Sequence, residues 1–121
     1  MGFHECLLEV TAALPETMLI TLMDRDGITL DTASGAATDI DLPSYLIEVT
    51  GAFSQVERSS QQLSTGAVDE LVLRTATLST VVRRVTDEYL LALSMKPEGN
   101  TGKARYWLRI TAPKLAKELI A

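Results

Sequence analysis

The feature that most constrains this chain is a run of apolar residues at helical spacing between Asp41 and Leu63. Successive members are four or three residues apart, and the run consists of Leu42, Leu46, Val49, Phe53, Val56, Ser60 and Leu63. An α-helix turns once every ~3.6 residues, so these side chains share one face, which only Ser60 interrupts. Asp41 can cap the first free N–H groups, and Pro43 suits the first turn. The spacing predicts a helix over 41–63 whose apolar face lies on the rest of the chain.

The remaining segments predict a mixed α/β fold. We expect a short helix over 4–14, strands over 17–23, 28–32, 71–76, 80–85 and 89–95, and a closing helix over 103–121. Pro113 lies inside the closing helix and predicts a kink or break near Thr111. The order α–β–β–α–β–β–β–α, with strands joined as hairpins, favours a five-stranded antiparallel sheet between helices. Residues 1–121 are expected to form a single domain.

The composition limits the kinds of partner that this chain can bind and the cellular compartment in which we expect it. The formal net charge is −5, with 16 acidic and 11 basic side chains, which argues against general nucleic-acid binding. A local basic patch is still available from Lys103, Arg105, Arg109, Lys114 and Lys117. The lone cysteine, Cys6, cannot form an internal disulfide, and no apolar run approaches the ~20 residues of a membrane span. No secretory signal is visible at the start. We therefore expect a cytoplasmic protein without membrane insertion.

Three stretches together resemble one known family. They are MLITLMDRDGITLDT at 18–32, with its Asp-x-Asp-Gly turn, the predicted helix at 41–63, and NTGKARYWLRITAPKLAKEL at 100–119. Their order and spacing resemble the roadblock family of dynein light-chain-type domains, which has a profilin-like fold. The resemblance covers nearly the whole chain, although the first helix is short and Pro113 interrupts the last.

This resemblance implies a homodimer in which the long helices of two subunits lie side by side and strand 71–76 pairs across the two-fold axis. Small residues on the flank of the long helix suit such packing. The expected dimer-interface residues are Gly51, Ala52, Gln55, Ser59, Gln62, Leu71 and Leu73.

The resemblance also implies a non-enzymatic module that regulates a small Ras-like GTPase of the MglA type, including activation of its GTP hydrolysis. The alternative is a structural adaptor subunit with no effect on hydrolysis. A third class, a small-ligand sensor, would need a pocket with convergent polar groups, and the sequence shows no set of residues to line one.

Three short motifs have both a chemical and a structural interpretation. His4 and Cys6 are two residues apart and do not face each other on a helix, so they predict neither a nucleophile–base pair nor a metal site. Asp24-x-Asp26-Gly27 lacks the later ligands of a calcium loop and predicts a hairpin turn. Residues 99–103 lack the spacing of a phosphate loop and predict a helix start. We assign no catalytic residue, cofactor or metal.

Arg83 and Arg84 are adjacent in the predicted strand 80–85, so their side chains point to opposite faces. Either both are solvated, or one is partly covered by a helix and bound to a carboxylate; the nearest in sequence belong to Glu70, Asp87 and Glu88. A third alternative is an arginine that reaches the nucleotide of a GTPase partner. Nothing in the sequence places either guanidinium there, so we expect any activation to reposition the GTPase's own groups.

Overall fold

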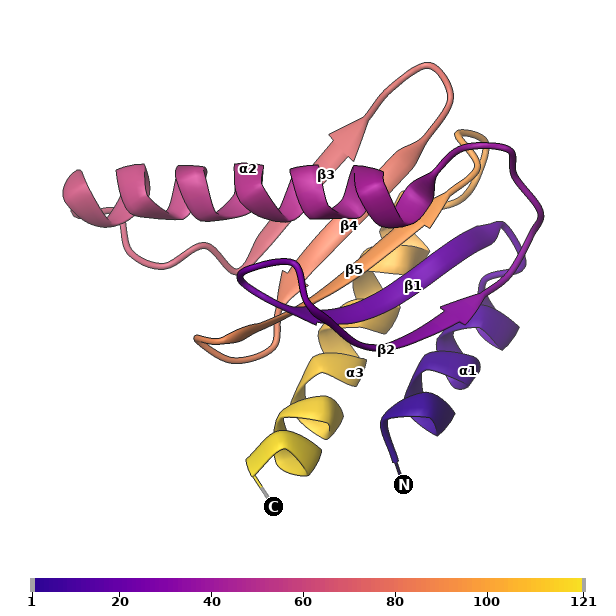
Figure 1. The fold of residues 1–121 in the computed structure, drawn as a ribbon, viewed down its shortest axis with the longest axis horizontal. Helices are drawn as coiled ribbons and strands as arrows, with labels where there is room; N and C mark the ends of the chain where they lie inside the picture. The colour runs from indigo at the N-terminus through magenta and orange to yellow at the C-terminus, as the bar shows by residue number, and fades with distance from the viewer. Residues whose placement is uncertain (1, 121) are drawn as a thin grey trace.

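The computed structural model describes residues 2–120 and has three layers, with the sheet in the middle (Figure 1). The elements are α1 (Phe3–Ala13), β1 (Thr17–Asp24), β2 (Thr29–Ser34), α2 (Leu42–Gln62), β3 (Glu70–Arg74), β4 (Ser79–Arg84), β5 (Tyr89–Met95) and α3 (Thr101–Ile120). The predicted order and the five-stranded antiparallel sheet are confirmed, and element bounds differ from the prediction by a few residues. The predicted final helical residue, Ala121, lies outside the described residues.

The strands follow the order β2-β1-β5-β4-β3, and every neighbouring pair is antiparallel. β1 and β5 therefore lie in the middle of the sheet, and nearly all of their residues are buried. This agrees with their sequences, which are apolar on both faces, as expected for strands covered on both sides. The two edges are β2 and β3.

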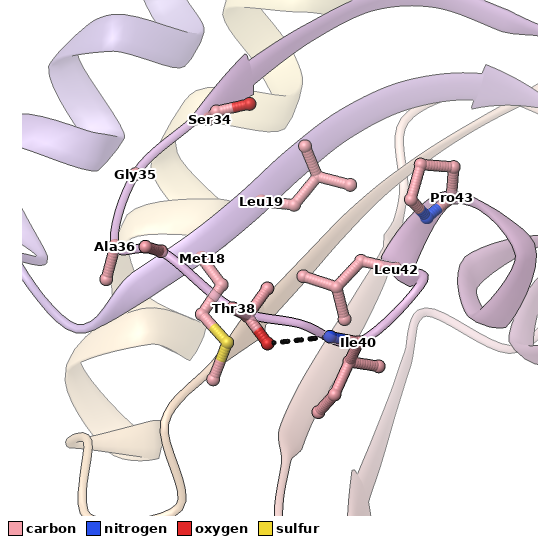
Figure 2. A pocket seen from close by; sticks show the side chains of 10 residues that line it. Met18, Leu19, Ser34, Gly35, Ala36, Thr38, Ile40, Leu42 and Pro43 are labelled. Carbon is pink, nitrogen blue, oxygen red and sulfur yellow. Dashed lines mark hydrogen bonds between the residues drawn. The ribbon is translucent and has the colours of Figure 1, made fainter.

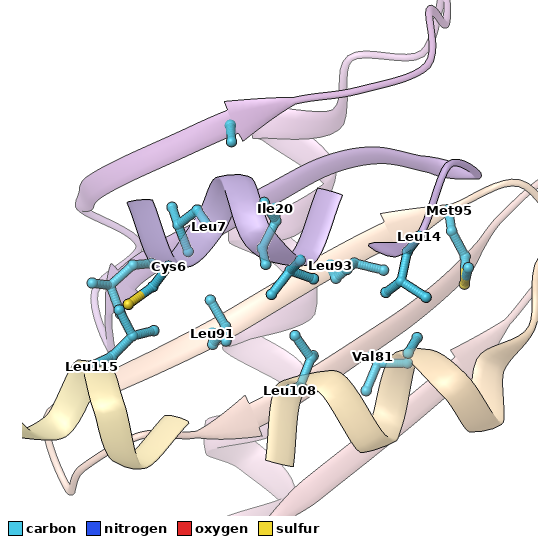
Figure 3. Packing of buried hydrophobic residues seen from close by; sticks show 14 residues of the cluster. Cys6, Leu7, Leu14, Ile20, Val81, Leu91, Leu93, Met95, Leu108 and Leu115 are labelled. Carbon is cyan, nitrogen blue, oxygen red and sulfur yellow. The ribbon is translucent and has the colours of Figure 1, made fainter. Parts of the chain in front are cut away.

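One core cluster lies between the sheet and the α1–α3 layer (Figure 3). α1 and α3 are in contact on the face of the sheet away from α2, and both chain ends lie at the same end of this layer (Figure 1). α1 contributes Leu7 and Val10, α3 contributes Leu108 and Leu115, and none of these four side chains is exposed. The periodic apolar positions of both helices thus face the sheet.

The second core cluster lies between the sheet and α2, and it corrects part of the prediction for this helix. Leu46 and Phe53 are fully buried, as the apolar spacing predicts. Val56 and Leu63, on the same predicted stripe, are 45% and 76% exposed. The reason is the width of the sheet, because the C-terminal end of α2 extends beyond the strands that its first turns cover (Figure 1).

Of the two effects predicted for Pro113, a kink or a break near Thr111, the break is absent from α3. The helix runs without a break from Thr101 to Ile120, with Pro113 inside it. Proline lacks the N–H that would bond to the carbonyl of Arg109, but Leu108 before it and Leu115 after it are fully buried in the core cluster, which holds both halves of the helix on the sheet. Among the helices of residues 2–120, none is long and apolar enough to cross a membrane.

Candidate interaction surface

α2 begins with the predicted cap. The Asp41 carboxylate accepts a bond from the Ser44 hydroxyl at 2.7 Å and one from the Ser44 backbone N–H at 3.3 Å. These bonds favour the ionised carboxylate, so the pKa of Asp41 lies below its ordinary value. Pro43 occupies the first turn, where its missing N–H leaves no bond unmade. The start of α2 is therefore set locally by its own sequence.

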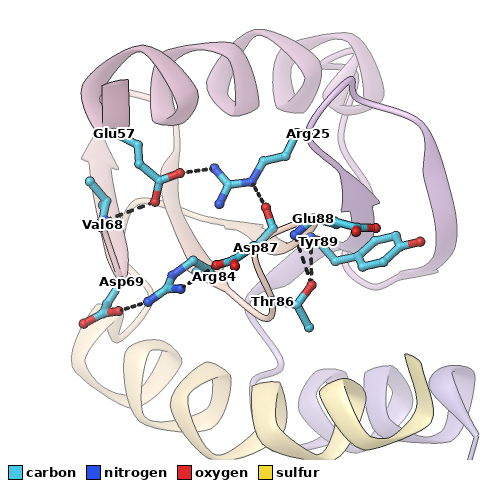
Figure 4. A network of polar contacts seen from close by, with 9 residues as sticks. All are labelled: Arg25, Glu57, Val68, Asp69, Arg84, Thr86, Asp87, Glu88 and Tyr89. Atoms are coloured by element: carbon cyan, nitrogen blue, oxygen red, sulfur yellow. Dashed lines mark hydrogen bonds and ion pairs between the residues drawn. The ribbon is translucent and has the colours of Figure 1, made fainter. Parts of the chain in front are cut away.

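The far half of α2 is held by long-range polar contacts around Glu57 (Figure 4). The Arg25 guanidinium, from the β1–β2 turn, lies 2.6 Å from one Glu57 oxygen and 5.2 Å from the centre of the Phe53 ring. The other Glu57 oxygen accepts the Val68 backbone N–H at 3.1 Å. Arg25 also donates through Nε to the Asp87 carbonyl at 3.1 Å. Glu57 thereby joins α2 to the β1–β2 turn and to the segment that leads into β3.

All seven residues predicted for the dimer interface are accessible. On α2 these are Gly51, Ala52, Gln55, Ser59 and Gln62, all exposed; on β3, Leu71 is half-buried and Leu73 is 38% exposed. Leu71 packs on the edge of the α2 core, and Leu73, two residues further along the strand, faces the same side of the sheet. The structure thus brings the predicted residues of α2 and β3 to the same side of the molecule.

Sequence reasoning missed two apolar members of this surface. Val56 and Leu63 lie on the helical flank of Ala52 and Ser59, because steps of three, four and seven residues keep side chains close around a helix. We assigned both to the core because their spacing continues the apolar stripe. Their exposure extends the apolar surface along α2, which we call the α2–β3 surface: the seven predicted residues with Val56 and Leu63.

The two sheet edges differ in how open they are. On β2, the Thr32 backbone N–H is bonded to the Asp31 carboxylate at 2.8 Å, and the ladder with β1 is irregular between Leu22 and Met23. A carboxylate at the edge and an irregular ladder are devices that prevent a strand from pairing with another. β3 pairs in regular register with β4 along its full length. No such bond to a side chain is found on the β3 backbone within residues 2–120, so β3 is the edge better suited to receive a further strand.

Arg83 and Arg84 are both half-buried and bound to carboxylates, so the solvated alternative is wrong. Arg84 lies 2.7 Å from Asp69 and 3.2 Å from Asp87 (Figure 4). The hydrogen bond and charge of Arg84 lower the pKa of Asp69. Glu70 lies 3.8 Å from Arg83 and holds Arg105 of α3 in two bonds of 2.6 and 3.2 Å. Asp69 is the partner that proximity in sequence did not suggest.

The short motifs have the structural roles that we predicted. The Asp24 carboxylate accepts the N–H groups of Asp26 and Ile28, both at 2.9 Å, and Gly27 has φ of +87° in the turn. The Asn100 side chain caps α3 by accepting the Lys103 N–H at 3.0 Å.

At the start of the chain, burial raises the pKa of the Cys6 thiol. Nδ1 of His4 lies 3.2 Å from the Asp31 carboxylate. Within residues 2–120, no group of three acidic, histidine or cysteine side chains is placed to hold a metal.

A shallow and mostly apolar pocket lies beside the start of α2 (Figure 2). It has a volume of about 290 Å³ and is lined by Met18, Leu19, Ser34, Gly35, Ala36, Ala37, Thr38, Ile40, Leu42 and Pro43. Its side-chain polar groups are two hydroxyls, and that of Thr38 already accepts the Ile40 N–H at 3.1 Å. No charged side chain lines it, which disfavours specific recognition of a polar small molecule.

Comparison with solved structures identifies the class of fold to which this chain belongs. The Roadblock/LC7 domain from Streptomyces avermitilis superposes with a TM-score of 0.85 at 15% identity, over 100% of both chains. The gliding protein MglB from Thermus thermophilus gives a TM-score of 0.84 at 20% identity, covering 95% of this chain and 86% of that one. No family model matches the sequence, and no curated protein matches it. The fold is therefore that of a small roadblock-type domain.

A further solved structure is similar enough in sequence to assign the family. MglC from Myxococcus xanthus is 33% identical, with a TM-score of 0.70, and the match covers 98% of this chain and 99% of that chain. The chain belongs to the roadblock family.

Proposed function

We propose that this chain is a homodimeric, non-enzymatic interaction module of the cytoplasm that regulates a small Ras-like GTPase of the MglA type. The observation that carries the proposal is the α2–β3 surface, which combines exposed apolar side chains on α2 with an open edge strand. Full-length similarity to MglC and the shared fold with MglB support the GTPase as partner.

The two chains of the proposed dimer meet through α2 and β3. Val56, Leu63 and Leu73 would leave water on pairing, and burial of apolar area stabilises such an interface by ~25 cal/mol per Å². Pairing of β3 with its copy across the two-fold axis would add backbone hydrogen bonds to the free edge. Mid-helix Gly51 fits this arrangement, because a Cβ added there would meet no atom within 4 Å and a second helix can approach closely.

The dimer is tested by replacing Ala52 with Arg. A long cation in the apolar centre of the interface would lose its water without a partner, so Ala52→Arg should halve the mass measured in solution. Gln61→Arg is the matched control, because Gln61 is exposed, lies nine residues away on α2 and therefore projects from the opposite side of the helix. An unchanged mass for Ala52→Arg would rule out this interface.

Regulation is tested with a purified MglA-type GTPase from the same organism, loaded with GDP or with a non-hydrolysable GTP analogue. We expect binding to the analogue-loaded form and faster GTP hydrolysis in single turnover. Arg83→Ala and Arg84→Ala should leave the stimulation intact, because both guanidinium groups are held by carboxylates of their own chain. Equal binding of both forms without a change in hydrolysis would indicate the structural adaptor instead, and no binding would overturn the proposal.

A further inference from the structure

The outward side of α3 is not that of an ordinary solvent-exposed helix. Opposite its buried stripe runs a second stripe with steps of three, four, three and four residues: Lys103, Tyr106, Ile110, Pro113 and Lys117. Tyr106 is 48% exposed, and the guanidinium of Arg109 lies over its ring, 5.6 Å from the ring centre. α3 holds five of the 11 basic residues of an acidic chain. This stripe combines two lysines with Tyr106, Pro113 and the half-buried Ile110, and a surface that mixes cations with apolar side chains suits a second contact.

The outward side of α1 has the opposite charge. Glu5 and Glu9 are exposed there, on either side of Leu8, which is 47% exposed. α1 contains no lysine or arginine. Where the two helices meet, Glu9 lies 3.8 Å from the amine of Lys114, so carboxylates of α1 already pair with a cation of α3 within one chain.

α1 and α3 lie side by side and run in opposite directions in one layer (Figures 1 and 3). We call their outward sides the α1–α3 face. A two-fold axis between the helices and parallel to them would place α1 of one copy on α3 of the other. Glu5 and Glu9 of each copy would then meet Arg109 and Lys117 of its partner, and the exposed Leu8 would meet the apolar side chains of the α3 stripe. An interface of this kind is self-complementary.

We propose that the α1–α3 face binds the same face of a second copy of this chain. Charge complementarity favours this occupant over an anionic membrane, because a flat membrane surface would meet the carboxylates of α1 together with the cations of α3. The pairing of two α1–α3 faces does not rest on the proposed function, because α2 lies on the other face of the sheet (Figure 1). A tetramer that uses both contacts does rest on the proposed dimer.

The contact is small, since α1 with its 11 residues is only about 16 Å long. A single pair of faces therefore associates weakly and in a salt-dependent manner. In a dimer formed through α2 and β3, both α1–α3 faces lie on one side of the joined sheet. Two such dimers stack through two copies of the contact, which raises the affinity by avidity and closes a tetramer.

The test is a charge exchange between copies, followed by sedimentation at low salt. Arg109→Glu with Lys117→Glu puts carboxylates on both sides of the proposed contact, and Glu5→Lys with Glu9→Lys puts cations on both sides. Each variant alone should have half the mass of the wild type, because like charges then oppose each other across the contact. An equimolar mixture should recover the wild-type mass, since every carboxylate again meets a cation.

Lys96→Glu with Gln61→Glu is the control, because it also makes the chain more acidic but at positions outside both the α1–α3 face and the α2–β3 surface. This control should keep the wild-type mass, and circular dichroism should show all variants folded. Halving by the exchange variants with no effect of Ala52→Arg would keep this inference and remove the proposed dimer. Halving by Ala52→Arg alone, or a mixture that does not recover mass, would overturn the inference and keep the dimer.

Discussion

The backbone of Thr17 lies so close to position 35 that only glycine fits there. A Cβ at this position would lie 2.1 Å from the Thr17 carbonyl oxygen, which itself accepts the Ala36 N–H at 2.7 Å. Gly35→Ala must therefore push the segment after β2 away from β1, and we expect a loss of about 1–3 kcal/mol, the usual cost of overpacking.

Gly51→Ala is the matched comparison for this prediction. No atom lies within 4 Å of its added Cβ, and alanine in mid-helix is favoured over glycine by about 0.5–1 kcal/mol. Urea unfolding at a concentration where both variants have the same mass would measure the difference. A Gly35→Ala variant as stable as the wild type would show that the segment moves freely.

Asp69 gives a residue-level prediction for the dependence of stability on pH. Arg84 lowers the folded-state pKa of Asp69 below that of the unfolded chain, so the ionised pair stabilises the fold. This contribution is complete above the unfolded pKa of ~3.9 and is lost as the pH falls through the lower folded pKa. Asp69→Asn should therefore lower the Tm at pH 7 and make no difference at strongly acidic pH. A gap in Tm that persists unchanged into acid would contradict the ion pair.

At the scale of the elements, the contact between Arg25 and Glu57 decides how the far half of α2 is held. Both side chains are mostly covered, at 21% and 12% exposed, so removing one partner leaves the other desolvated and uncompensated. Glu57→Ala should cost up to about 3 kcal/mol of unfolding free energy. The double variant Arg25→Met with Glu57→Leu should be more stable than Glu57→Ala, because it leaves no buried charge unpaired.

Chemical denaturation of Arg25→Met, Glu57→Leu and the double variant that combines them completes a double-mutant cycle. Strictly additive losses would mean that Arg25 and Glu57 do not interact in solution. Arg58→Ala serves as the control, because Arg58 is exposed on the same helix and bonds only to Gln55 three residues earlier among the described residues. Its removal should change stability little.

The same elements show what sequence reasoning can reach. The helix over 41–63 was predictable because cap, proline and apolar spacing are all local signals, and the hairpin at 24–27 was predictable because glycine takes the positive φ of its turn. The exposure of Val56 was not predictable, since it depends on where the sheet ends beneath α2. The pairing of Arg25 with Glu57 joins residues 32 positions apart, and no periodicity reports such a contact.

At the scale of the whole molecule, the sheet has two edges with different chemistry, and this difference can be measured. β2 has its Thr32 N–H bonded to the Asp31 carboxylate, whereas β3 presents an open edge beside the exposed side of α2. If the α2–β3 surface forms the dimer, the outward N–H groups of β3 gain bonds to the partner chain and are protected from hydrogen exchange. The outward N–H groups of β2 gain no such bonds.

Amide hydrogen exchange followed by NMR should therefore show slow exchange along residues 70–74 in the wild type and fast exchange along the outer side of 29–34. In Ala52→Arg, protection should disappear from the outward N–H groups of β3, while β1 and β5, in the interior of the sheet, stay protected by global stability. Gln61→Arg should match the wild type. A wild-type dimer in which β3 exchanges as fast as β2 would mean that the chains meet elsewhere, and the α1–α3 face would then be the remaining surface with complementary charge to join them.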